Sequence, residues 1–148
     1  MFFLYAERGI MEKTLSVLQY VLSAIGAFLG WFLGGVDGFM TAIIWFVVID
    51  YLTGVMVAIV EKKLSSKVGF RGIFKKVIIF CLIGISNILD VYVIQSGSAI
   101  RLAVIMFYIY NEGISILENV SVLGLPVPQK LKDVLEQVGN HDKRESEQ

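Results

Sequence analysis

Residues 45–76 combine a long apolar run with a dense cluster of lysine and arginine. A helical apolar run of about 20 residues matches the thickness of the hydrocarbon core of a bilayer. A short connection rich in positive charge is typical of the cytoplasmic side of a membrane protein. The stretch therefore predicts a membrane-spanning helix that ends in the cytoplasm, after which the chain returns to the bilayer.

The same alternation of apolar and charged segments runs through the whole chain. Hydrophobic residues make up 56% of the 148 residues, a larger share than in an average soluble domain, which is also richer in charged residues. Most charged residues gather before residue 15, between residues 61 and 76, and after residue 129. We expect an all-α membrane protein with four spans, at about residues 15–34, 40–60, 77–95 and 101–117. A three-span fold is the alternative, because the fourth segment carries polar residues and would then lie partly in the interface.

Residue types that carry most enzyme chemistry are scarce. The single cysteine, Cys81, lies in an apolar run and cannot form an intrachain disulfide. The single histidine, His141, lies in the charged tail. No Ser-His-Asp triad, metal cluster or phosphate-binding glycine loop can be assembled. We therefore expect no enzymatic activity, no metal site and no cofactor.

The basic cluster determines the predicted orientation of the spans. Its members are Lys62, Lys63, Lys67, Arg71, Lys75 and Lys76, opposed by a single acid at Glu61. Because such clusters stay in the cytoplasm and contact lipid phosphates, both termini are predicted to be cytoplasmic. The serines and glycines of this segment predict a bent connection over residues 61–76 and not a helix. The segment is too short for a nucleic-acid-binding domain, so no nucleic-acid partner is expected.

Small residues recur at four-residue spacing in the first two apolar segments. Because such residues lie on one side of a helix, they let another helix approach closely. Two faces are predicted to mediate helix packing or oligomerisation: Gly26, Gly30 and Gly34 in the first segment, and Asp50, Gly54 and Ala58 in the second. The sequence leaves open whether the partner helix belongs to the same chain or to another subunit.

Polar residues interrupt the apolar segments at five places: Asp50, Asn87, Asp90, Asn111 and Glu112. Helical rise places Asp50 and Asn87 near the midplane. An unpaired charge at that depth is costly, so such residues face the protein interior or water. Two roles remain open, namely hydrogen bonding between helices and the lining of an aqueous path in an oligomer. Asp90 and Arg101 fall in the outer part of consecutive helices, and we expect a salt bridge between them.

The two ends of the chain are predicted to be cytoplasmic. Residues 1–14 lack the features of a cleaved signal peptide, and we hypothesise a second translation start at Met11, because the preceding Glu-Arg-Gly permits a purine-rich ribosome-binding site. Within residues 120–148, apolar residues at helical spacing follow two prolines: Leu131, Val134, Leu135 and Val138. They predict a short amphipathic helix on the membrane or on a neighbouring subunit. Residues 140–148 are predicted to be a disordered, charged tail.

Three motifs occur in a fixed order over residues 15–138. They are DYLTG at residues 50–54, KLSSKVGFRG at residues 63–72 followed by two lysines at 75 and 76, and NEGISILEN at residues 111–119 followed by Gly124, Pro126 and Pro128. Together they resemble the toxin-secretion and phage-lysis holin family of Gram-positive bacteria and their phages, which includes the clostridial toxin-release holins. Members are often described with three spans, whereas hydropathy predicts four here.

The resemblance implies a multi-pass protein of the bacterial cytoplasmic membrane. Such a protein accumulates among membrane lipids, forms homo-oligomers and opens a lesion through which endolysin or toxin passes as cargo. An antiholin, or a longer-start form of the same chain, is the implied regulatory partner. Two other classes stay open from the residues themselves: a small ion or proton channel or transporter subunit, and a non-conducting membrane scaffold.

Overall fold

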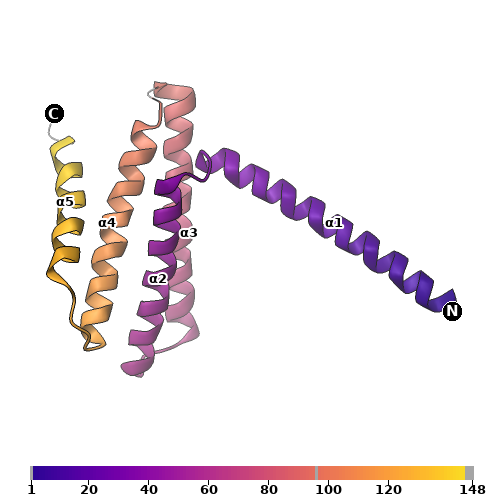
Figure 1. Cartoon of the computed structure of the whole chain (residues 1–148), viewed down its shortest axis with the longest axis horizontal. Coiled ribbons are helices and arrows are strands. Elements are labelled where there is room, and N and C mark those ends of the chain that lie inside the picture. The colour runs from indigo at the N-terminus through magenta and orange to yellow at the C-terminus, as the bar shows by residue number, and fades with distance from the viewer. Residues whose placement is uncertain (1, 96, 146–148) are drawn as a thin grey trace.

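The computed structural model describes residues 2–95 and 97–145, which form helices joined by short connections (Figure 1). The helices are α1 (Phe2–Leu33), α2 (Gly38–Val60), α3 (Ser66–Ile88), the π-helix η1 (Leu89–Ile94), α4 (Ala99–Val122) and α5 (Gln129–Glu145). Four segments are long and apolar enough to cross a membrane: Met11–Leu33, Gly38–Val60, Gly69–Ile94 and Ala99–Val122. The prediction of an all-α membrane protein with four spans and a C-terminal helix is confirmed.

Helices α2, α3 and α4 form a bundle, in which α2 and α4 run in the same direction and share the largest interface (Figure 1). The core consists mainly of β-branched side chains: Ile43 and Val47 from α2, Ile79 and Ile83 from α3, and Ile105 and Ile109 from α4, with Met40 beside them. Lipid tails are as apolar as these residues, so burial alone drives little association in a bilayer. Close packing of stiff side chains and polar contacts between helices must therefore hold the bundle together.

Helix α1 extends away from the bundle and meets it only near its C-terminal end (Figure 1). None of its apolar stretch from Met11 to Leu33 is buried. Residues 2–14, predicted as a separate N-terminal segment, continue this helix. The ring of Phe32 lies so close to Gly84 of α3 that a Cβ atom there would overlap it. The contact with α3 therefore requires a glycine at position 84.

The connection between α2 and α3 is shorter than predicted. It comprises residues 61–65, in which Lys62 adopts a left-handed φ of 57°, and α3 then begins at Ser66. The prediction of a bent connection through residue 76 was therefore wrong. Lysine and arginine favour helix, and the glycines of this segment provide close packing: a Cβ at Gly72 would lie 3.3 Å from the ring of Tyr51.

Helix α5 packs along α4 in the opposite direction (Figure 1). Leu135 is only 3% exposed and covers Gly113 of α4. The predicted amphipathic helix is present and packs against α4 of its own chain. Its contact with the membrane surface or with a neighbouring subunit stays a prediction. Residues 140–145, predicted to be disordered, are helical. Residues 146–148 lie outside the described part of the chain.

Candidate intramembrane polar site

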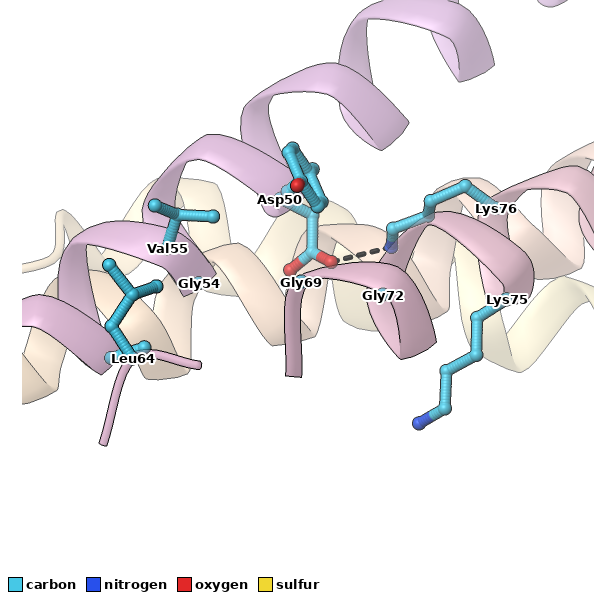
Figure 2. A pocket seen from close by; sticks show the side chains of 10 residues that line it. Asp50, Gly54, Val55, Leu64, Gly69, Gly72, Lys75 and Lys76 are labelled. Atoms are coloured by element: carbon cyan, nitrogen blue, oxygen red, sulfur yellow. Dashed lines mark hydrogen bonds and ion pairs between the residues drawn. The ribbon is translucent and has the colours of Figure 1, made fainter. Parts of the chain in front are cut away.

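An ammonium group and two carboxylates meet near the middle of the bundle. Nζ of Lys76 on α3 lies 2.6 Å from Oδ2 of Asp50 on α2, and it also binds Oε2 of Glu112 on α4. The side chains are 16%, 13% and 10% exposed, respectively. Figure 2 shows Asp50 and Lys76 directed toward one another, whereas Lys75 points away. We call Lys76, Asp50 and Glu112 the ion triad.

Asn119 of α4 extends the ion triad toward the cytoplasmic end. Its Nδ2 donates to Oδ1 of Asp50 at 3.2 Å and to the hydroxyl of Thr53 at 3.0 Å. Both carboxylate oxygens of Asp50 therefore have a partner. This matters because an unpaired polar group is expensive at bilayer depth, and both oxygens are satisfied within the bundle.

The ion triad joins three helices and combines one basic side chain with two acidic ones. If all three groups are ionised, two carboxylates face one ammonium and the net charge is −1. Charged groups removed from water are tolerated when they are paired and hydrogen-bonded, and removing one partner leaves an uncompensated charge. Lys76 is thus the central member, because it alone contacts both acids.

A cavity of about 210 Å³ adjoins Asp50 between α2 and α3. It extends to Leu64 in the connection between the two helices, and three glycines of its lining expose bare backbone: Gly54, Gly69 and Gly72 (Figure 2). Its lining is mainly apolar, with Asp50, Lys75 and Lys76 as the charged groups, and its volume is large enough for several water molecules. It therefore connects the ion triad with the predicted cytoplasmic end of the bundle.

A second polar cluster, centred on Arg101 of α4, holds the end of α1 at the opposite end of the bundle. Arg101 is 4% exposed and donates from Nε to the carbonyl of Leu33 at 2.6 Å, and from Nη2 to that of Gly35 at 3.1 Å. Nη1 binds Oδ2 of Asp37 at 2.7 Å. The hydrogen bond from Arg101 lowers the pKa of Asp37, against the opposing effect of burial. Arg101 thereby satisfies carbonyls that a helix end leaves without partners.

Asn87 and Asp90 complete this outer cluster. Nδ2 of Asn87 donates to the carbonyls of Trp31 and Phe32, at 3.2 and 3.1 Å. Asp90 is 1% exposed and accepts the backbone N–H groups of Ile100 and Arg101, at 3.1 and 2.7 Å. Because helix N-termini favour negative charge, Asp90 acts as a cap of α4 from the π-helix.

The predicted Asp90–Arg101 salt bridge has a different form in the structure. The two residues do meet, but Asp90 binds the backbone of Arg101, and the guanidinium binds Asp37. Depth along the helices predicted which residues lie at one level. It carried no information on the turn after α1, which brings Asp37 to the guanidinium.

Of the five predicted intramembrane polar residues, Asp50 and Glu112 belong to the ion triad. Asn87 and Asp90 belong to the outer cluster. Asn111, which was expected to share their interior role, is exposed, and within the described part of the chain its side chain donates only to the carbonyl of Phe107 in its own helix.

Two residues of the site were not predicted from the sequence: Lys76 was given another role, and Asn119 was not identified. Lys76 was assigned to lipid contact with the rest of the basic cluster, whereas the structure turns it inward. Asn119 lies seven residues after Glu112 and so on the same helical face, a spacing that could have identified it. The remaining basic residues are exposed near the same end of the bundle: Lys62, Lys63, Lys67, Arg71 and Lys75. Their contact with lipid phosphates stays a prediction.

The two predicted small-residue faces differ in their surroundings. Gly26 and Gly30 have nothing near them in the chain, and Gly34 lies in the turn after α1 with a φ of +78°. A Cβ at Gly34 would also overlap the side chain of Asn87. Gly54 faces α4, where a Cβ would lie 3.7 Å from Nδ2 of Asn119, and Ala58 is buried. Oligomerisation through either face stays a prediction.

Comparisons with known proteins place these features within one family. A model described as the bacteriophage holin family matches residues 27–140, which include both polar clusters. The chain is 37% identical over 130 residues to an uncharacterized 14.9 kDa protein of Clostridium perfringens from the nagH 3' region, covering 88% of this chain and 98% of that protein. It is 38% identical over 119 residues to an uncharacterized protein of Listeria monocytogenes, covering 80% and 84%.

A third relative is the uncharacterized protein YtkC of Bacillus subtilis, which is 31% identical over 134 residues and covers 90% and 98% of the two chains. No solved structure matches the chain. Among the described residues, no group of three or more histidine, cysteine, aspartate or glutamate side chains is arranged to hold a metal ion. The chain belongs to the bacteriophage holin family, a non-enzymatic class of multi-pass proteins of the cytoplasmic membrane.

Proposed function

We propose that this protein accumulates as homo-oligomers in the bacterial cytoplasmic membrane and opens a lesion that releases endolysin or toxin. The observation that carries the proposal is the ion triad inside a bundle built for lipid. Its charges are satisfied only while α2, α3 and α4 stay together. Membership of the holin family supports an oligomeric membrane role.

The ion triad suits a protein with two states. In a single bundle the charged groups face one another and the apolar side chains face lipid. If the helices separate, an ammonium, two carboxylates and the amide of Asn119 lose their partners, and only water can replace them. Copies that open together share such a wet surface, whereas one copy alone cannot, so opening depends on local density.

The test is induced expression in a bacterium, with membrane potential and release of a folded, endolysin-sized reporter followed together. The proposal expects a delay at constant potential, then an abrupt loss of potential with release of the reporter. A strain expressing the same amount of an unrelated four-span protein is the control. Loss of neither potential nor reporter would favour a non-conducting scaffold instead.

A small proton or ion channel is the second candidate, favoured by the cavity that reaches Asp50 from the connection between α2 and α3. This candidate expects graded dissipation of the potential that scales with expression, while the folded reporter stays inside the cell. The size of what crosses the membrane therefore separates the two functions.

The regulatory partner that we propose is a longer-start form of this chain. Translation from Met1 adds ten residues before Met11, and the added segment continues α1. N-terminal mass spectrometry of the membrane-bound protein is expected to detect both products. Replacing Met11 by leucine removes the shorter product and is expected to shift the time of lysis; an unchanged product pattern would contradict the dual start.

A further inference from the structure

Helix α5 packs against α4 along its length, beside the part of α4 that is long and apolar enough to cross a membrane. Leu135 covers Gly113, where a Cβ would lie 2.6 Å from its Cδ2. Farther along, Gly139 lies against the ring of Tyr110, where a Cβ would lie 2.7 Å from Cε2. Figure 1 shows the two helices side by side and antiparallel.

These contacts locate α5 relative to the bilayer. The candidate span of α4 ends at Val122. Gly113 precedes that end by nine residues and Tyr110 by twelve, which at 1.5 Å per residue is about 14 and 18 Å. Half of the hydrocarbon core is about 15 Å. With α4 across the membrane, docked α5 therefore reaches the bilayer midplane.

The face of α5 that does not touch α4 is mainly polar. Leu135 and Gly139 are turned toward α4, whereas the opposite face exposes Lys130, Asp133 and Gln137. Glu136 lies at one edge of this face, and the exposed apolar side chains of Leu131 and Val134 lie at the other. Placing a lysine or aspartate in lipid at the centre of a bilayer costs about 2.5–3.5 kcal/mol even on insertion scales. Contact between this face and lipid is therefore energetically unfavourable.

Helix α4 adds polar groups of its own. Asn111 and Glu118 are seven residues apart, so they share one helical side, and both are exposed. Neither belongs to the ion triad. The paired helices α4 and α5 therefore present water-seeking side chains outside the core of the bundle, at the depth of the membrane.

We propose that the exposed face of α5 lines the water-filled lumen of the lesion, together with Asn111 and Glu118 of α4. This inference rests on the proposed function and names the surface that meets the passing water. The match to the holin family extends through residue 140 and so includes the docked part of α5. In this arrangement α5 stays on α4 while copies of the chain surround the lumen, and its polar face adds to the wet surface that separation of α2, α3 and α4 exposes.

The first arm of the test asks whether α5 is docked in a membrane. In full-length protein carrying Cys81→Ser, Tyr110→Cys is combined with Gly139→Cys and reconstituted in lipid vesicles. Removal of the Tyr110 ring leaves room for the new side chain, and mild oxidation is expected to form a disulfide. The matched control combines Tyr110→Cys with Gln137→Cys, because Gln137 is exposed and lies on the opposite face of α5 from Gly139. A helix free in the cytoplasm or on the membrane surface would leave both pairs equally unlinked, which overturns the inference.

The second arm measures currents through planar bilayers. A charged, membrane-impermeant thiol reagent is expected to reduce the conductance of Glu136→Cys and of a second variant, Asp133→Cys, each in the Cys81→Ser background. Ile78→Cys, at an exposed apolar position of α3, is the control and is expected to keep its conductance. Unchanged currents in both α5 variants overturn the lumen assignment. If the Cys81→Ser parent carries no current beside an active wild type, the same α5 variants are measured in a Cys81→Ala background. Absence of current in the wild type overturns the proposed function, and the lumen with it.

Discussion

Lys76 and Asp50 are 26 residues apart in the chain, yet Nζ of the lysine lies 2.6 Å from Oδ2 of the aspartate inside the helical bundle. Glu112 binds the same ammonium from a third helix. One positive charge therefore joins α2, α3 and α4 at a depth where lipid cannot solvate it. Because apolar burial contributes little in a bilayer, we regard this contact as a main determinant of how the three helices associate.

Replacing Lys76 by methionine is expected to be the most damaging single change in the ion triad. It leaves Asp50 and Glu112 facing one another without a cation, and breaking a buried pair in this way costs about 3–5 kcal/mol. Thermal unfolding in lipid-detergent micelles measures the loss. Lys75→Met is the matched control, since Lys75 is exposed and is expected to change stability little.

The same logic predicts a rescue. Adding Asp50→Asn and Glu112→Gln to Lys76→Met removes the unpaired charges and is expected to restore a large part of the lost stability. Equal instability of the single and the triple variant would show that the lysine contributes through packing and not through its charge.

Replacing Asp50 by leucine is expected to delay lysis. The variant leaves Lys76 with one carboxyl partner, Glu112, in place of two, so the closed bundle contains fewer polar groups and is better suited to lipid. Lysis time at equal expression is the measurement. Ile49→Leu, at the adjacent exposed position, serves as control; identical timing of the two variants would remove Asp50 from the opening step.

The Arg101–Asp37 pair predicts an effect of pH on the anchoring of α1. The pKa of Asp37 is lowered in the folded protein, so the pair stabilises the fold above the unfolded pKa of about 3.9. That stability is lost as pH falls through the lower, folded pKa. Since Asp37 is 46% exposed, solvent screening limits the effect to about 1 kcal/mol.

Asp37→Asn isolates this charge, because asparagine keeps the cap on the N–H of Met40. Hydrogen exchange at the amides of Gly34 and Gly35, measured from pH 7 to 3, is expected to show acid loosening in the wild type that is weaker in the variant. A wild-type profile as flat as that of Asp37→Asn would argue against the ion pair.

The positions of the spans were predictable because hydropathy is a local property. Helical rise predicted that Asp50 and Asn87 share the midplane, whereas the structure joins Asp50 to Glu112 through Lys76 and places Asn87 in the outer cluster. It could not tell which way α4 is rotated about its axis, and that rotation decides that Asn119 faces α2 while Asn111 faces outward.

Errors at the two ends of α3 have different causes. Lys76 was grouped with a loop, since serine and glycine often break helices; here packing of Tyr51 against the glycines favours a helix from Ser66 onward. At the other end, the partner of Arg101 depends on the turn at residues 34–37. Such turn geometry follows from how α1 meets α3, which no local pattern encodes.

Replacement by alanine is expected to have different effects at Gly84, which contacts α1, and at Gly30, which lies in α1. Gly84→Ala places a Cβ in the ring of Phe32 and is expected to cost about 1–3 kcal/mol by overpacking, measured as unfolding and as faster exchange of the α1 end. Gly30→Ala meets nothing in the chain. It is expected to leave the stability of the single chain unchanged and to weaken cross-linking between copies in membranes. Loss of single-chain stability in Gly30→Ala would contradict an intermolecular role.

The way α1 is held makes its tilt dependent on the thickness of the bilayer. Its apolar stretch of 23 residues is about 34 Å long, and a hydrocarbon core of about 30 Å allows it to lean at most about 30° from the membrane normal. Yet α1 runs obliquely away from the bundle (Figure 1). If α2 to α4 stand upright, α1 must rotate toward them about Gly34 and Gly35, both with positive φ. A thinner membrane permits more tilt and a thicker one less, so membranes of different lipid composition would set different angles between α1 and the rest of the protein.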